Sequence, residues 1–266
     1  MTLPPDTWAR GAAYDRFMGR WSRLIADAFL AWLRLPPGGH WLELGCGTGA
    51  LTGRILELAH PTTLHACEPA AGLLAQARLN CRDPRASFTE AGISQIPPRP
   101  GGYDAVVSGL VLNFLPDPGA GVQAMARVAT PRGTVAAYVW DYAGGMEFLR
   151  HFWDAATQLD PAAQGADEGQ RFPLCQPEPL RATWAQAGLQ DTQTRPLEVV
   201  TTFANFDDYW EPFEAGQGPA PTWLLTLSPD RQAALRALVR DRLPTRADGS
   251  IVLQARAWAI AGRAPG

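Results

Sequence analysis

The 266-residue chain contains no lysine, and all 23 of its basic side chains are arginine. Without lysine the protein can form no side-chain Schiff base, and it lacks both a P-loop lysine and the strand lysine of kinases. The four cysteines are Cys46, Cys67, Cys81 and Cys175. Neither they nor the four histidines have the spacing of a metal site, and the cysteines suggest no disulfide framework. We therefore expect no structural metal and a reducing, cytoplasmic location.

Long apolar runs and an excess of basic charge are also missing. No apolar run approaches the length of a membrane span. The first residues, Met1–Asp6, lack the basic start and apolar stretch of a signal peptide. The net charge is -3 and the pI about 5.8, which argues against an electrostatic grip on phosphate backbones. We expect neither a nucleic-acid partner nor a membrane partner.

The most informative stretch is His40–Glu68, in which an apolar run meets alternating glycines. Its parts in chain order are the run Trp41–Leu44, the glycines Gly45, Gly47 and Gly49, the helical segment Ala50–Ala59, the second apolar run Thr63–Cys67 and the acid Glu68. A strand–turn–helix–strand–acid unit of this kind binds a nucleoside at the carboxyl edge of a parallel sheet. The acid then lies where it can accept hydrogen bonds from the ribose hydroxyls.

Two classes of ligand fit this unit. Gly45, Gly47 and Ala50 satisfy the dinucleotide fingerprint in its looser form, with alanine in the last place. Glu43 separates the two classes, because an anionic pyrophosphate needs no carboxylate two residues before the first glycine. A ligand with an ammonium group would need such a carboxylate. S-adenosylmethionine is a ligand of this kind, since it carries an α-amino group, a sulfonium and no phosphate.

Three motifs over about the first half of the chain carry a family resemblance. Glu43-x-Gly45-x-Gly47-x-Gly49 resembles the first motif of class I S-adenosylmethionine-dependent methyltransferases. The run Glu68–Arg78 resembles their second motif, an acid followed by a helix opening, and Tyr103–Leu110 is similar to their fourth strand. The resemblance implies S-adenosylmethionine as the cofactor.

The resemblance also implies further site residues. In similar methyltransferases the segment before the first strand forms a lid, so Tyr14 and Arg20 are expected at the methionine end, with Arg20 on its carboxylate. A solvated surface charge is the alternative for Arg20. Gly92 stands where relatives usually have an acid that binds the adenine amino group, which leaves the backbone of Gly92 and Ile93 for that contact. The remaining residues assigned to the cofactor site are Cys46, Pro69, Ser108 and Gly109.

The expected fold is α/β, a Rossmann-like doubly wound sheet of seven mostly parallel strands with an antiparallel last strand. We expect one methyltransferase domain over residues 1–266. It would comprise an N-terminal helical lid (1–39), a cofactor-binding core (40–142) and a C-terminal half with substrate-cap insertions (143–266). The later strands are expected over 86–90, 103–109, 133–140, 198–203 and 251–261. The other helices are expected over 14–35, 73–80, 120–129, 147–158, 180–187, 206–214 and 229–242, with irregular segments over 160–179 and 216–222.

Methyl transfer is a displacement at carbon, so alignment of the acceptor matters more than a covalent nucleophile. A hydroxyl, amine or carbon acceptor can also need a base. The candidates are His151, Asp141 and Tyr142, which follow the fifth strand. A structural role is the alternative for His151, and a turn cap is the alternative for Asp141. Asn113 is a candidate for binding the acceptor or for capping its turn.

Two other functions stay open. A nicotinamide-dependent oxidoreductase would carry an apolar residue at position 43 and usually a lysine near its hydride site. A non-catalytic nucleoside-binding protein could use the same fold. Among methyltransferases, the absence of an Asn/Asp-Pro-Pro-Tyr motif argues against base methylation, since Ser108–Val111 stands in its place. The expected acceptor is therefore a small molecule.

Overall fold

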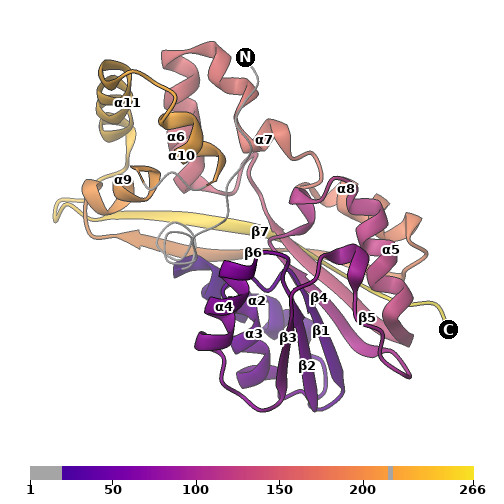
Figure 1. Cartoon of the computed structure of the whole chain (residues 1–266). Helices are drawn as coiled ribbons and strands as arrows, with labels where there is room; N and C mark the ends of the chain where they lie inside the picture. The colour runs from indigo at the N-terminus through magenta and orange to yellow at the C-terminus, as the bar shows by residue number, and fades with distance from the viewer. Residues whose placement is uncertain (1–19, 215–217) are drawn as a thin grey trace. The chain divides into compact units, whose positions relative to one another are not determined.

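The computed structural model describes residues 20–214 and 218–266, which form a seven-stranded mixed sheet with helices (Figure 1). The strand order is β3-β2-β1-β4-β5-β7-β6, and β7 is antiparallel to the others. The strands are β1 (His40–Leu44), β2 (Thr63–Cys67), β3 (Ala86–Thr89), β4 (Tyr103–Gly109), β5 (Ala129–Trp140), β6 (Gln190–Phe203) and β7 (Ile251–Arg263). The expected fold class is confirmed.

The helices alternate with the strands through the first half of the chain. The α-helices are α2 (Arg20–Leu33), α3 (Ala50–Arg54), α4 (Ala71–Asn80), α5 (Pro118–Val128), α6 (Glu147–Leu159), α7 (Glu168–Arg171), α8 (Pro177–Gln186), α9 (Phe206–Glu214), α10 (Pro219–Leu224) and α11 (Pro229–Arg242). The shorter turns are a π-helical turn, η2 (Ile55–Ala59), and the 3-10 turns η3 (Ile93–Gln95), η4 (Leu112–Phe114) and η5 (Pro161–Gly165).

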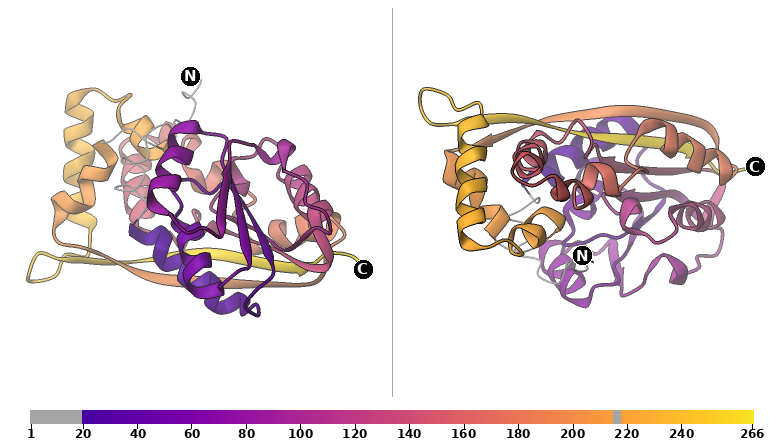
Figure 2. Two further views of the ribbon diagram at one scale, coloured as in Figure 1. Left: turned by 60° about the horizontal axis from the view of Figure 1, so that its bottom comes forward. Right: turned by 90° about the horizontal axis from the view of Figure 1, so that it is seen from above.

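The chain divides into two compact units. In the described chain, the first unit comprises Arg20–Trp21, Trp140–Pro173 and Glu198–Arg256, without residues 215–217, and the second comprises Ser22–Val139, Leu174–Leu197 and Ala257–Gly266. The expectation of a single domain with a lid and a cap stays a prediction. The long strands β6 and β7 have residues in both units, and they lie side by side in both views of Figure 2.

The second unit holds the parallel strands. In β1 every residue but His40 is buried, as expected for a strand of a sheet that is covered on both faces. Helices α3 and α4 lie on one side of these strands and α5 and α8 on the other (Figure 1). The parallel pairing puts Glu43 beside Ala66 of β2 and Val107 of β4. The acid of the first motif therefore lies in the middle of the sheet.

Several helices of the chain begin as their sequences dictate. Asp117 caps α5 by accepting a hydrogen bond from the Ala120 backbone N–H at 2.9 Å, and Pro118 occupies the first turn. Ser228 and Pro229 start α11 in the same way.

An aromatic cluster forms the core of the first unit. Phe148 and Phe152 each place their ring centroid 4.5 Å from that of Phe213, in stacked geometry. The Tyr209 hydroxyl donates a 2.7 Å hydrogen bond to the Phe148 carbonyl, which gives this buried phenol a partner. Trp21 packs against Phe148 as well, with centroids 4.8 Å apart.

The structure differs from the sequence predictions in five segments. The fifth strand begins at Ala129 rather than Gly133. The helix expected over 50–59 changes to a π-helical turn after Arg54. The sixth strand begins at Gln190 rather than Glu198. Residues 160–179, expected to be irregular, contain η5, α7 and the start of α8. The loop expected over 216–222 includes the first part of α10.

The N-terminal part of the first expected helix lies outside the described residues. Tyr14 is among them, and so is Gly19, at which a break was expected. Arg20 opens α2, but the described part of the chain does not include its side chain. The predicted contacts of Tyr14 and Arg20 with the methionine end stay predictions.

Candidate cofactor site

The glycine turn after β1 is held against the end of β2. The backbone N–H groups of Gly45 and Cys46 both donate to the Cys67 carbonyl, at 2.8 and 3.0 Å. Gly45, Gly47 and Gly49 all have positive φ, a region that favours glycine. A Cβ at Gly47 would meet nothing within 4 Å, whereas one at Gly45 would lie 2.4 Å from the Val111 side chain. The turn is therefore packed at Gly45 and open at Gly47.

Glu43 is buried beside this turn. The residue is 1% exposed, and its Oε2 accepts a 2.6 Å hydrogen bond from the Thr52 hydroxyl of α3. Burial raises the pKa of Glu43 to about 7, and the nearby Glu68 carboxylate adds to the rise, while the Thr52 hydrogen bond opposes it. No arginine or histidine is paired with Glu43 among the described residues.

Glu68 ends β2 on the same edge of the sheet. Its Oε2 accepts from the Gly47 N–H and its Oε1 from the Ala70 N–H, both at 3.0 Å. Burial raises the pKa of Glu68, and the two backbone hydrogen bonds partly offset this. A carboxylate has about four acceptor positions, so each oxygen retains capacity for a further donor such as a ribose hydroxyl.

The segment after β3 runs past the end of β2. The Ala91 N–H donates to the Glu68 carbonyl at 3.3 Å, which brings Gly92 close to this acid along the chain. A Cβ at Gly92 would meet nothing within 4 Å. Ile93 directs its side chain toward α5, where its Cδ1 would lie 3.0 Å from a Cβ at Gly121. Gly92 thus borders open space, and the predicted adenine contact of Gly92 and Ile93 stays a prediction.

The other residues assigned to the cofactor have mixed surroundings. Ser108 uses its hydroxyl to donate a 3.0 Å hydrogen bond to the Leu44 carbonyl, so the side chain joins β4 to β1. Cys46 packs in a buried cluster with Ala66, Leu74 and Ala77, and burial raises the pKa of its thiol. Pro69 is exposed beside Glu68. Cofactor contacts by Ser108 and Cys46 would therefore use backbone atoms.

The residues present fit a ligand with an ammonium group and a ribose. In the described chain the buried Glu43 carboxylate has neutral donors from Thr52 alone, its hydroxyl and its backbone N–H, and a cation beside it would offset the remaining cost of burying the charge. The open Gly47 leaves room for close approach to the backbone. Asn113, 8% exposed in η4 after β4, has a buried Nδ2 without a hydrogen-bond acceptor in the described chain. An unmet donor of this kind fits a ligand oxygen.

Part of the chain matches a known protein family. Residues 42–137 match the family described as a methyltransferase domain. An uncharacterized Synechococcus protein is 29% identical over 169 residues, which are 61% of this chain and 40% of that protein. The chain thus spans well under half of this curated relative.

Two solved structures share the fold. A putative methyltransferase from Bacillus halodurans has a TM-score of 0.59 at 11% identity, covering 91% of this chain and 99% of that one. Phosphoethanolamine N-methyltransferase 2 from Haemonchus contortus, solved with phosphomonomethylethanolamine and S-adenosylhomocysteine, has a TM-score of 0.59 at 15% identity, covering 96% of this chain and 57% of that one.

Residues 42–137 therefore carry a methyltransferase domain. The first sequence motif falls on the end of β1 and the glycine turn, the second begins directly after β2 and runs into α4, and the third falls on β4. S-adenosylmethionine is the cofactor of this family.

The base candidates of this methyltransferase lie in the first unit, whereas the cofactor turn lies in the second. Asp141 is buried, and its Oδ2 accepts from Nε and Nη2 of Arg256 at 2.7 and 2.6 Å. Its Oδ1 accepts from the Gly144 N–H at 3.2 Å. Both oxygens of Asp141 therefore hold the turn after β5 to β7, the capping role that the sequence left open.

Tyr142 lies in the turn after β5, and His151 lies on α6. Tyr142 is buried, with its ring centroid 5.5 Å from that of Phe172. His151 is half-buried on α6, and burial lowers the pKa of its imidazole. A lowered pKa keeps the ring neutral at pH 7, the form that can accept a proton.

The sequence did not predict two residues that support the candidate site, Thr52 and Asn80. Thr52 is the hydrogen-bond partner of Glu43, nine positions before it. The sequence signal for this contact was the short distance along the chain from the strand to the first turn of the next helix. Asn80 donates from Nδ2 to the Thr48 carbonyl at 2.8 Å and so braces the glycine turn from α4. In the described chain, no three His, Cys, Asp or Glu side chains form a group suited to a metal ion.

Proposed function

We propose that the chain transfers a methyl group from S-adenosylmethionine to a small-molecule acceptor by direct in-line displacement. The observation that carries this proposal is Glu43, a carboxylate 1% exposed beside a glycine turn, which in the described chain is paired with the hydroxyl and backbone N–H of Thr52 and with no cation. A ligand ammonium would compensate its charge. A pyrophosphate would be repelled by it.

Each side chain would have a separate task. Glu43 would hold the amino group, Glu68 the ribose hydroxyls, and the backbone at Gly92 and Ile93 the adenine edge. Tyr14 and Arg20 would cover the methionine end. When bound, S-adenosylmethionine supplies a methyl group already activated by its sulfonium. The protein would then contribute alignment and exclusion of water, and alignment can be worth several kcal/mol.

Three observations support a small-molecule acceptor. The chain is acidic, with a net charge of -3, and so offers no broad basic surface to a nucleic acid. The Haemonchus enzyme of the same fold was solved with a small phosphorylated amine, phosphomonomethylethanolamine. The unmet Nδ2 donor of Asn113 suits an acceptor molecule that presents an oxygen.

For the proton of the acceptor we propose His151 as the base, with Tyr142 second. Asp141 is the weakest of the three because its oxygens are held by Arg256 and Gly144. We also propose that residues 1–39 serve as a lid and residues 143–266 as the acceptor cap. Among the described residues, no helix is long and apolar enough to cross a bilayer. A cytoplasmic location stays a prediction from the free cysteines.

Ligand binding tests the proposal against its alternatives. Isothermal titration should show binding of S-adenosylmethionine and S-adenosylhomocysteine but not of NAD. Glu68→Ala should weaken S-adenosylmethionine by about 1–3 kcal/mol, the range for hydrogen bonds to charged groups. Binding of NAD alone would favour an oxidoreductase. Binding of S-adenosylmethionine without release of S-adenosylhomocysteine across an acceptor panel would favour a non-catalytic nucleoside-binding protein.

A further inference from the structure

An open cavity of about 570 Å³ lies in the second unit. It borders Gly49, the last glycine of the turn, but neither Glu43 nor Glu68 lines it. Its walls come from α2, from α3 and η2, and from the segment that joins α4 to β3. Four arginines line it, one from α2, one from α3 and two from the segment before β3. They are Arg23, Arg54, Arg82 and Arg85.

The lining carries more positive than negative charge. Glu57 and Asp83 are the two carboxylates among the lining residues, against four guanidinium groups. This excess stands out in a chain whose net charge is -3. A ligand of this cavity is therefore expected to be negatively charged.

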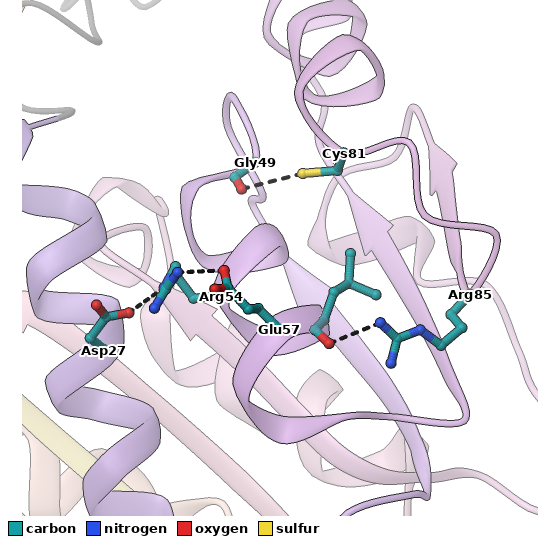
Figure 3. A network of polar contacts seen from close by, with 7 residues as sticks. Asp27, Gly49, Arg54, Glu57, Cys81 and Arg85 are labelled. Carbon is teal, nitrogen blue, oxygen red and sulfur yellow. Dashed lines mark hydrogen bonds and ion pairs between the residues drawn. The ribbon is translucent and has the colours of Figure 1, made fainter.

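Two of the guanidinium groups are held in place by carboxylates. Arg54 bonds Asp27 through Nε and Glu57 through Nη1 (Figure 3). Arg85 bonds both oxygens of Asp83, and its Nη2 also donates to the Leu56 carbonyl at 2.9 Å. In Figure 3 Arg54, which directly precedes η2, lies beside Asp27 of α2, and Arg85 reaches η2 from the other side. A guanidinium has five N–H donors, so Nη2 of Arg54 and Nη1 of Arg85 retain capacity.

The other two arginines are exposed and without a carboxylate partner among the described residues. Arg23 projects from α2, and Arg82 follows Cys81 at the end of α4. Arg23 and Arg82 line the cavity from two different walls and can take a ligand without breaking an existing ion pair.

We propose that this cavity binds a small molecule bearing a diphosphate or a comparable multiply charged phosphate group. Guanidinium groups pair with phosphate oxygens in bidentate geometry, and several arginines around one volume require a ligand with several anionic oxygens. The volume is within the range of small-molecule sites. The methyl donor carries no phosphate, so this ligand is distinct from it.

The test is titration of the full chain with sodium pyrophosphate at constant ionic strength. Arg23→Gln combined with Arg82→Gln should weaken pyrophosphate at least tenfold. The matched control is Arg127→Gln combined with Arg195→Gln, which removes the same charge from two exposed arginines of the second unit that do not line the cavity. The control should stay within twofold of the parent chain.

Three results would overturn the proposal. They are the absence of pyrophosphate binding, equal weakening by the two double variants, and citrate binding as tightly as pyrophosphate. The last would mean that the cavity selects charge and not phosphate. Titration of the Arg23/Arg82 double variant with S-adenosylmethionine is the folding control. Retained binding there, with loss of pyrophosphate, separates this site from the methyl-donor site.

Discussion

The Glu43 carboxylate near the carboxyl end of β1 accepts a 2.6 Å hydrogen bond from the Thr52 hydroxyl on α3. The bond crosses from the sheet to the helix that follows the glycine turn. This hydrogen bond satisfies one oxygen of the buried carboxylate. Ionisation of Glu43 at neutral pH still costs free energy, because burial raises its pKa to about 7. Glu43 is therefore suited to bind a cation.

Glu43→Gln removes that charge and keeps an oxygen for Thr52. We expect it to weaken S-adenosylmethionine by about 1.5–3 kcal/mol, the range for hydrogen bonds to charged groups, without destabilising the free protein. The parent chain should also bind more tightly as the pH rises from 6 to 7.5 and Glu43 ionises, whereas the variant should not. Isothermal titration at the two pH values measures both effects. Equal affinity of parent and variant would refute the role of Glu43.

Glu168 gives a second pH-dependent effect, on stability. It is 1% exposed, its Oε2 accepts from Trp153 Nε1, and burial raises its pKa to about 7. Because the folded pKa lies above the unfolded one, the folded chain keeps a proton that the unfolded chain has lost between these values. The stabilisation from Glu168 is therefore present below about pH 4.5 and is lost as the pH rises through 7, by about 3 kcal/mol in all.

Urea unfolding of the parent and of Glu168→Gln at pH 5 and 7.5 tests this. The stability of the parent relative to the variant should fall between the two pH values. Glutamine keeps an acceptor for Trp153, so a difference that is the same at both pH values would show that Glu168 does not titrate in this window.

Gly45 and Val111 are expected to couple. A Cβ at position 45 would lie 2.4 Å from the Val111 side chain, at a positive φ of 72°. Gly45→Ala should cost about 2–4 kcal/mol from overpacking and backbone strain. With Val111→Ala the loss should be smaller than the sum of the single losses by about 1–2 kcal/mol. Gly47→Ala, which meets open space, should cost only about 1–2 kcal/mol. Thermal or urea unfolding measures all four variants.

The Asp141–Arg256 pair should matter for stability. Removing Arg256 leaves the buried Asp141 charge unpaired, at a cost of about 2–3 kcal/mol, less than for a fully buried pair because Arg256 is partly exposed. Asp141→Asn combined with Arg256→Gln should recover much of this loss. If Asp141→Asn alone abolished turnover while the fold and S-adenosylmethionine affinity were kept, Asp141 would be a base instead.

His151→Asn tests the proposed base. We expect kcat to fall by about 10²–10⁴ with the affinity for S-adenosylmethionine unchanged, the usual range for loss of a general base. The acidic limb of the pH–rate profile should disappear, and in the parent it should lie below the ordinary histidine value because burial lowers the pKa of His151. His60→Asn, at the exposed end of η2, is the matched control. Equal rates for the two variants would exclude His151.

The sequence predicted the sheet and the glycine turn well, for physical reasons. Strands β1 and β4 are buried on both faces, so they read as continuous apolar runs. The first half of β6 is mostly exposed at the sheet edge and contains Pro196, so it carries no apolar pattern to detect. Helix α7 spans four residues, too few for helical periodicity, although its cap Asp167 was visible in the sequence.

Contacts between distant residues were beyond prediction. Asp141 and Arg256 are 115 positions apart, and nothing in either segment indicates the pair. The unmet donor of Asn113 depends on what surrounds a buried amide, which no spacing reveals. The contact between Thr52 and Glu43 was easier to predict, because only the glycine turn and the start of α3 separate the two residues in the chain.

The π-helical turn η2 has a consequence for insertions and deletions. A switch from an α- to a π-helical pattern leaves a backbone carbonyl without a partner inside the helix, and here the Leu56 carbonyl accepts from Arg85. Deleting one residue between 55 and 59 would restore the regular ladder and reorient His60. Arg85 would then lose the Leu56 carbonyl and keep only Asp83 as a partner, so proteins with a shorter segment here are expected to tolerate a different residue at position 85.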